Sequence, residues 1–135
     1  MSRKIFVNLP VADLARSMAF FRALGFSFNA QFTDETAACM VVSEDIYVML
    51  LSRAKFAGFT GKPVADAHAT TEVLVALSMD SKAEVVALTD AAVAAGATEA
   101  KPLNDMGFMA IRSFNDLDGH IWEIFWMDPS HVQAG

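Results

Sequence analysis

Glu123 is the residue whose type and surroundings most directly indicate chemistry. It lies near the C-terminus, in the segment Asp118-Gly119-His120-Ile121-Trp122-Glu123-Ile124-Phe125. An Asp-Gly pair followed by alternating apolar residues is typical of a turn that leads into a strand. Side chains alternate between the two faces of a strand, so Glu123 shares its face with Ile121 and Phe125. A carboxylate in that setting is a candidate metal ligand, catalytic base or ligand contact, and its partners decide which.

The elements that must position Glu123 start with a strand and a helix near the N-terminus. Residues 4–9 predict the strand, and Asp13 predicts the start of a helix that ends before Gly25. Three further strands are predicted over residues 26–32, 36–43 and 46–52. The first part of the chain therefore has the order β-α-β-β-β.

A second copy of this pattern follows a long connection. Residues 55–71 contain scattered Gly, Pro and polar residues, which favours a linker or a lid. A strand is predicted next, and Ser81 with Glu84 has the spacing of a capping box for a helix that ends before Gly96. The four strands of this half are predicted over residues 72–79, 97–101, 108–114 and 120–127. We predict an α+β fold of two tandem β-α-β-β-β modules, at about residues 1–54 and 72–128, with a tail over residues 129–135.

The two predicted modules can be aligned residue on residue. Phe6-Val7-Asn8-Leu9 falls on Leu74-Val75-Ala76-Leu77, and Met49 falls on Glu123. Each helix must bury its apolar stripe against one face of its sheet. The opposite faces then carry Phe6, Asn8, Met49, Leu74, Ala76 and Glu123. If the two sheets curve toward each other, these side chains line a common trough within one domain, residues 1–135.

Composition and charge narrow the range of partners. The chain has 135 residues, of which 54% are hydrophobic, and its eleven Phe and eight Met can fill a core and line a cavity. A net charge of −6 argues against nucleic acid or an anionic membrane as a partner, because no basic patch is present to release phosphate counterions. Cys39 is alone, so no disulfide framework is expected. Without a signal peptide or a membrane span, we expect a soluble cytoplasmic protein.

The sequence resembles the vicinal oxygen chelate superfamily, which includes glyoxalases, bleomycin-resistance proteins and extradiol dioxygenases. The resemblance rests on Asn8-Leu9-Pro10-Val11-Ala12-Asp13-Leu14 with Ser17 through Phe26, and on Phe114 through Glu123. It implies that the two modules form a curved, half-open mixed sheet, the glyoxalase-like fold. It also implies a homodimer with two equivalent sites, because an open sheet leaves strand edges that a twofold partner can cover.

The resemblance also implies where a metal would bind. In metal-dependent members, four strands contribute His, Glu or Gln to one divalent cation, and the matched positions here are Phe6, Met49 or a neighbour of it, Leu74 and Glu123. Only Glu123 can bind a hard cation, and zinc sites in proteins use three or four protein ligands. We therefore expect a degenerate metal site and no cofactor. An alternative metal site that uses Asn8 or Glu72, each two residues from a matched position, is disfavoured.

The three histidines are expected in turn or surface roles. His120 lies at the predicted turn on the face opposite Glu123, His68 lies in the connection, and His131 lies in the tail. Only His68 can reach the trough, and only if the connection acts as a lid. None of the three is assigned a catalytic role.

Two classes of function remain open. The first is a binding protein that holds a small apolar or aromatic molecule in the trough, between aromatic walls that can include Trp122 or Trp126. Its predicted contacts are Phe6, Asn8, Met49, Leu74, Phe108, Arg112, Glu123 and Phe125. The second is a metal-dependent glyoxalase-type lyase or isomerase that uses Glu123 as a ligand or as the catalytic base.

The enzymatic alternative needs more than a base. Proton abstraction beside a carbonyl also needs an electrophile for the enediolate oxygen, and Arg112, on the strand predicted over residues 108–114, is the nearest candidate. A third interpretation is an interaction domain whose trough is filled by its own side chains. Apart from these functions, Glu123 has a purely structural alternative, in which it pairs with Arg112 or hydrogen-bonds a Tyr or an Asn.

Overall fold

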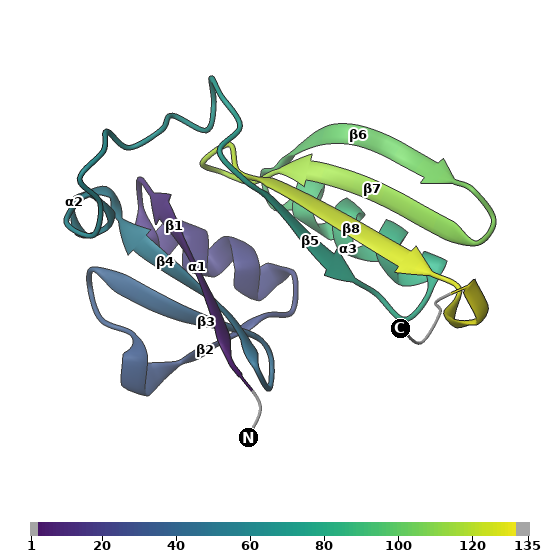
Figure 1. Ribbon diagram of the computed structural model, residues 1–135, viewed down its shortest axis with the longest axis horizontal. Coiled ribbons are helices and arrows are strands. Elements are labelled where there is room, and N and C mark those ends of the chain that lie inside the picture. The colour runs from purple at the N-terminus through teal and green to yellow at the C-terminus, as the bar shows by residue number, and fades with distance from the viewer. Residues whose placement is uncertain (1–2, 132–135) are drawn as a thin grey trace. The chain divides into compact units, whose positions relative to one another are not determined.

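The computed structural model describes residues 3–131, and the chain divides into two compact units, with the boundary in the sequence between Ala65 and Asp66 (Figure 1). Each unit contains one β-α-β-β-β module and one open, mixed, four-stranded sheet. The predicted α+β class and the tandem modules are therefore confirmed. Among the helices of this part of the chain, none combines the length and the apolar character that a membrane crossing requires.

The N-terminal unit, residues up to Ala65, has a sheet in the strand order β1-β4-β3-β2. The pair β1 and β4 is parallel, and the other pairs are antiparallel. Its elements are β1 (Ile5–Val11), α1 (Leu14–Ala23), β2 (Ser27–Asn29), the 3-10 helix η1 (Ala30–Phe32), β3 (Ala37–Ser43), β4 (Ile46–Ser52) and the short helix α2 (Arg53–Ala57).

Helix α1 forms where the sequence predicts it and covers one face of this sheet. The Asp13 side chain caps its N-terminus by accepting a hydrogen bond of 3.1 Å from the Arg16 N–H. Phe20 and Phe21 are buried from the helix side. The sheet residues that complete this core are Leu9, Ala38, Met40, Val48 and Leu50. The face of the sheet opposite α1 is therefore the one left for a site.

The C-terminal unit, residues from Asp66 onward, repeats this plan with the strand order β5-β8-β7-β6. Here β5 and β8 are parallel and the other pairs are antiparallel. Its elements are β5 (Leu74–Ser78), α3 (Lys82–Ala94), β6 (Thr98–Asp105), β7 (Met109–Asn115), β8 (Ile121–Met127) and the 3-10 helix η2 (Pro129–His131). Ser81 caps α3 by accepting a hydrogen bond of 3.2 Å from the Glu84 N–H, and the Glu84 carboxylate accepts one of 2.9 Å from the Asp80 N–H.

Strand pairing confirms the predicted alignment of the two modules. Asn8 on β1 pairs with Met49 on β4, and at the same place in the other unit Ala76 on β5 pairs with Glu123 on β8. Residues paired in a ladder point to the same face of a sheet. Met49 and Glu123 therefore occupy equivalent positions on the faces opposite the helices.

Three local predictions differ from the structure. The strand predicted over residues 26–32 ends at Asn29, because the Asn29 side chain accepts a hydrogen bond of 2.9 Å from the Gln31 N–H and starts η1. Strand β6 runs on to Asp105 although it contains Pro102, and two register shifts accommodate it. The predicted connection begins with the helix α2, which Ser52 caps.

Candidate functional site

Glu123 lies in a row of side chains that crosses the C-terminal sheet on the face opposite α3. Ala76 on β5 and Ser113 on β7 flank it, and Lys101 on β6 pairs with Ser113. Neighbouring strands are about 4.8 Å apart, so Lys101 lies two strands, or about 10 Å, from Glu123. The row places an acid, a hydroxyl and an amine on one face.

A pocket of about 480 Å³ lies over Glu123, Ser113 and Lys101, and we call it the C-terminal pocket. It is formed by Lys101, Pro102, Leu103, Asn104, Ile111, Arg112, Ser113 and Glu123. Leu103, Pro102 and Ile111 provide an apolar surface, while Glu123 and Ser113 provide acceptor and donor groups. A mainly apolar hollow with a few polar groups is the usual composition of a small-molecule site.

Glu123 is partly buried, and none of the hydrogen bonds or ion pairs found in residues 3–131 uses its side chain. The carboxylate therefore keeps its acceptor capacity for a molecule in the C-terminal pocket. Sequence reasoning found Glu123 but missed Lys101 and Ser113. Their signal was weak, because it depends on the register of β6 and β7, which the irregular strand β6 obscures.

Arg112 directs its guanidinium away from Glu123. It pairs with Ile124, one residue from Glu123, and so its side chain lies on the face that α3 covers. There it donates to Glu99, to Asp90 at 2.7 Å and to the Val86 carbonyl at 3.3 Å. Burial lowers the pKa of Arg112, but the hydrogen bonds to Asp90 and Glu99 outweigh it and raise the pKa above its ordinary value. The interpretation in which Glu123 pairs with Arg112 is wrong, although Arg112 borders the C-terminal pocket.

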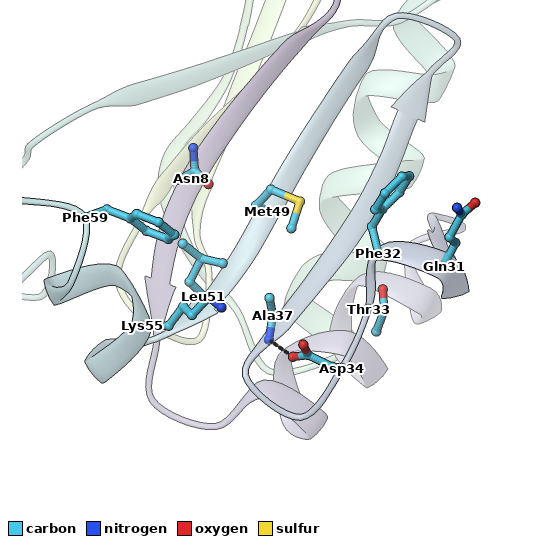
Figure 2. A pocket seen from close by; sticks show the side chains of 10 residues that line it. All are labelled: Asn8, Gln31, Phe32, Thr33, Asp34, Ala37, Met49, Leu51, Lys55 and Phe59. Atoms are coloured by element: carbon cyan, nitrogen blue, oxygen red, sulfur yellow. Dashed lines mark hydrogen bonds between the residues drawn. The ribbon is translucent and has the colours of Figure 1, made fainter.

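The N-terminal unit has a pocket of its own on the face opposite α1, which Figure 2 shows and which we call the N-terminal pocket. Two predicted contact residues, Asn8 and Met49, line it. Its volume is about 400 Å³, and the other lining residues are Gln31, Phe32, Thr33, Asp34, Ala37, Leu51, Lys55 and Phe59. Asn8 and Phe59 also line a neighbouring hollow of about 370 Å³ with Phe56 and Thr60.

The remaining predicted contacts lie outside the two named pockets. Phe6 is 49% exposed and stacks on Tyr47, with the ring centroids 4.8 Å apart, and Leu74 is 52% exposed. Phe108 precedes β7, and its ring lies 5.1 Å from the His131 ring. Phe125 pairs with Ile111 on the same face as Glu123. Their role as ligand contacts stays a prediction.

His120 has a structural position that the sequence did not reveal. It is only 2% exposed, and its Nδ1 atom lies 2.8 Å from Glu72 Oε1. Its backbone N–H donates at 3.0 Å to Asp116 Oδ1, which also accepts from the Asp118 N–H, while Asp116 Oδ2 accepts from Trp122 Nε1 at 2.9 Å. The expected turn position holds, but a surface role does not fit. The Glu72 carboxylate therefore already has a hydrogen-bond partner, His120, within the C-terminal unit.

The side chains at the family's metal positions do not suit a divalent cation. Phe6 and Leu74 have no donor atom, and Met49 offers only a soft thioether beside the single carboxylate of Glu123. Across residues 3–131, no group of three or more His, Cys, Asp or Glu side chains is arranged to hold a metal ion. We therefore derive no chemical step through a metal.

Comparisons with known proteins agree with this architecture. A model of the family described as bleomycin resistance protein-like N-terminal matches residues 3–43. A hypothetical protein from S. aureus is 25% identical, with a TM-score of 0.78 over 93% of this chain and 95% of its own. A glyoxalase/bleomycin resistance protein/dioxygenase family enzyme from Burkholderia phytofirmans PsJN is 17% identical, with a TM-score of 0.77 over 93% and 99%. A comparison with curated proteins found no match.

A glyoxalase/bleomycin resistance protein/dioxygenase from Nocardioides is 22% identical, with a TM-score of 0.68 over all of this chain and 92% of its own. The paired β-α-β-β-β modules, each with one open four-stranded sheet, are the glyoxalase-like fold. The chain has the fold of proteins described as glyoxalase/bleomycin resistance/dioxygenase, the group also called vicinal oxygen chelate, and its residues 3–43 match the bleomycin resistance protein-like family model. The predicted resemblance is confirmed.

Proposed function

We propose that this protein binds a small apolar or aromatic molecule in the C-terminal pocket, with Glu123 as the polar contact. The observation that carries the proposal is the Glu123 carboxylate, which borders a pocket of about 480 Å³ and has no hydrogen-bonding side chain or main-chain partner within residues 3–131. A half-buried carboxylate is most stable when a donor satisfies it. A ligand with an apolar body and a hydrogen-bond donor or a positive charge supplies that donor.

Binding is favoured over catalysis because Glu123 offers a base, whereas Lys101, the positive group on the same face, lies about 10 Å away across two strands. Stabilising an enediolate needs a positive group or metal at the developing negative charge. The Arg112 guanidinium is engaged by Asp90 and Glu99 on the other face of the sheet, and Glu123 is the single hard donor among the four metal positions. The match to a bleomycin resistance protein-like family over residues 3–43 supports a binding role of the sequestering kind.

A matched pair of probes tests the proposal. 1-Naphthylmethylamine and 1-naphthalenemethanol share an aromatic body, but only the amine is a cation at neutral pH. The full chain is expected to bind the amine more tightly, and Glu123→Gln is expected to reduce that preference roughly tenfold, the loss of about 1.4 kcal/mol typical of a charge-assisted hydrogen bond. Titration calorimetry measures both ligands.

Glu44→Gln is the control, because Glu44 is an exposed carboxylate in the turn between β3 and β4. It removes the same charge without touching the C-terminal pocket and should leave both affinities unchanged. Equal binding of the amine by the wild-type chain and by Glu123→Gln contradicts the proposed role of Glu123.

A further inference from the structure

The N-terminal pocket is built as a site in its own right (Figure 2). Its floor is aliphatic, because Ala37 on β3 pairs with Leu51 on β4, and Met49 lies on the same face two residues away. Phe59 and Phe32 stand on opposite sides of this floor. They are 72% and 58% exposed, so both rings are accessible to a ligand on this floor.

The wall that carries Phe32 is held in place by local hydrogen bonds. The Thr33 hydroxyl donates to the Asn29 carbonyl at 2.7 Å and accepts from the Cys39 N–H at 3.1 Å. Asp34 Oδ1 accepts from the Thr36 N–H, the Thr36 hydroxyl and the Ala37 N–H at 2.7, 2.8 and 3.0 Å. The wall therefore does not have to order itself when a ligand arrives, which reduces the entropic cost of binding.

The opposite wall is fixed to the same sheet through α2. The Ser52 hydroxyl accepts from the Lys55 N–H at 3.2 Å, and the Ser52 N–H donates to the Thr36 carbonyl at 2.9 Å. The Phe59 N–H donates to the Phe56 carbonyl at 3.0 Å. The start of the connection thus places both Lys55 and Phe59 at the pocket.

Lys55 gives the N-terminal pocket a positive group. Figure 2 shows its side chain running from α2 alongside Leu51. No ion pair within 4.0 Å in residues 3–131 includes Lys55, and the nearby Asp34 uses one oxygen for three donors of its own loop. The ammonium therefore has donors to spare for a ligand, while the amides of Asn8 and Gln31 add further polar contacts.

We propose that the N-terminal pocket is a second binding site, specific for a flat aromatic molecule that carries one carboxylate. The ring lies on the floor of Met49, Leu51 and Ala37 between Phe59 and Phe32, and the carboxylate accepts hydrogen bonds from Lys55. About 400 Å³ is within the usual range for small-molecule pockets and suits a compact ligand of two fused rings. Asp34 is engaged by the N–H and hydroxyl groups of its own loop, so Lys55 is the charged group left for a ligand and the site prefers an anion.

2-Naphthoate and 2-naphthamide test this inference on the full chain, because they share shape and ring area and differ in charge. Calorimetric titration is expected to show tighter binding of 2-naphthoate. Lys55→Met keeps the helix propensity and most of the length of the side chain. This variant should reduce the affinity for 2-naphthoate roughly tenfold, as expected for the loss of a charge-assisted hydrogen bond. Its affinity for 2-naphthamide should be unchanged.

Three further variants separate the alternatives. Lys62→Met removes an exposed lysine that does not line the pocket and should change nothing. Phe59→Ala should weaken both probes, because both stack on the ring. Glu123→Gln should leave 2-naphthoate binding intact, so this inference and the proposed function fail independently. Equal affinity for the two probes, no binding of 2-naphthoate, or an unchanged affinity in Lys55→Met overturns the proposal.

Discussion

His120 Nδ1 lies 2.8 Å from Glu72 Oε1, and this contact joins the turn before β8 to the segment before β5. The imidazole is 2% exposed, whereas the Glu72 side chain is 28% exposed. The Glu72 carboxylate, near the start of the C-terminal unit, thus forms a hydrogen bond with a ring nitrogen of the buried His120. A buried polar atom that loses its partner is costly, so the contact should contribute to stability.

Glu72→Ala should lower the free energy of unfolding by about 1–3 kcal/mol, the usual cost of leaving a buried hydrogen-bonding group without its partner. Urea unfolding followed by circular dichroism measures the change. Glu35→Ala, at an exposed position before β3, is the control and should stay within about 0.5 kcal/mol of the wild-type chain. An equal effect of both variants would mean that the His120 contact adds nothing.

Gly119 in the same turn leads to a second prediction. Its φ is +85°, and a Cβ atom there would lie 2.8 Å from the backbone of Ala67 and His68. Gly107 also has a φ of +85°, but a Cβ atom there would meet nothing within 4 Å. Gly107→Ala should cost only the strain of the left-handed conformation, about 1–2 kcal/mol.

Gly119→Ala should cost at least about 1 kcal/mol more than Gly107→Ala, because the backbone of the connection must also move. Urea denaturation of the two variants side by side gives the difference, and the shared φ removes conformational strain from the comparison. If both variants lose the same stability, the backbone at Ala67 does not make a close steric contact with Gly119.

The duplicated pattern made much of this architecture predictable. Alternation with period two fixes which face each strand residue occupies, and the equivalence of Met49 and Glu123 followed from aligning two short segments. Caps are equally local, and so Asp13 and Ser81 start α1 and α3 as predicted.

The features that were missed depend on tertiary contacts. Arg112 forms hydrogen bonds with Asp90 on α3 and Glu99 on β6, which are 22 and 13 residues away in the sequence. Hydrophobic periodicity cannot predict which distant residues a side chain will contact. Phe59 and Lys55 fall in a Gly- and Pro-rich segment that resembled a linker. The two Phe residues at the start of that segment, Phe56 and Phe59, were the available signal.

The pKa of Asp34 should lie below the ordinary aspartate value, and the pKa of Asp116 should lie above it. Hydrogen bonds from the Thr36 backbone, the Thr36 hydroxyl and then Ala37 lower the pKa of Asp34, with a smaller effect from Lys55. Burial raises the pKa of Asp116, against the opposing effects of His120 and Trp122 and of the backbone N–H groups. Carboxyl carbon shifts in an NMR titration should show Asp34 ionising first as pH rises and Asp116 later.

The sign of each contribution to stability follows from linkage. Asp34 stabilises the folded state above its unfolded pKa, and this contribution is lost as pH falls through its lower folded pKa. Asp116 acts in the opposite sense, because its folded form holds the proton more tightly and stability declines as pH rises from the unfolded pKa through the folded one. Ionisation of Asp116 before Asp34 would refute this order.

Metal content is the next prediction. Purified protein should contain a substoichiometric amount of zinc, nickel, manganese or magnesium by elemental analysis, and none of these ions should raise its melting temperature. The reason is the donor set, because Phe6 and Leu74 have no donor atom and Met49 offers only a thioether beside the carboxylate of Glu123. A stoichiometric ion that is lost in Glu123→Gln and retained in Glu72→Gln would contradict this view and revive the metal-dependent lyase.

The last prediction concerns assembly, and we propose that the protein is a homodimer. The sheet order leaves β1 and β5 as edge strands of their sheets, and large apolar side chains are exposed on both, namely Ile5, Phe6 and Leu74. Exposed apolar edges invite pairing with another chain unless a partner covers them. Light scattering after size exclusion should give twice the 14.6 kDa of one chain.

Phe6→Lys should shift the mass toward the monomer by placing a charge on β1, whereas Val93→Lys on the exposed face of α3 should not. A wild-type chain that is monomeric at micromolar concentration would refute the dimer.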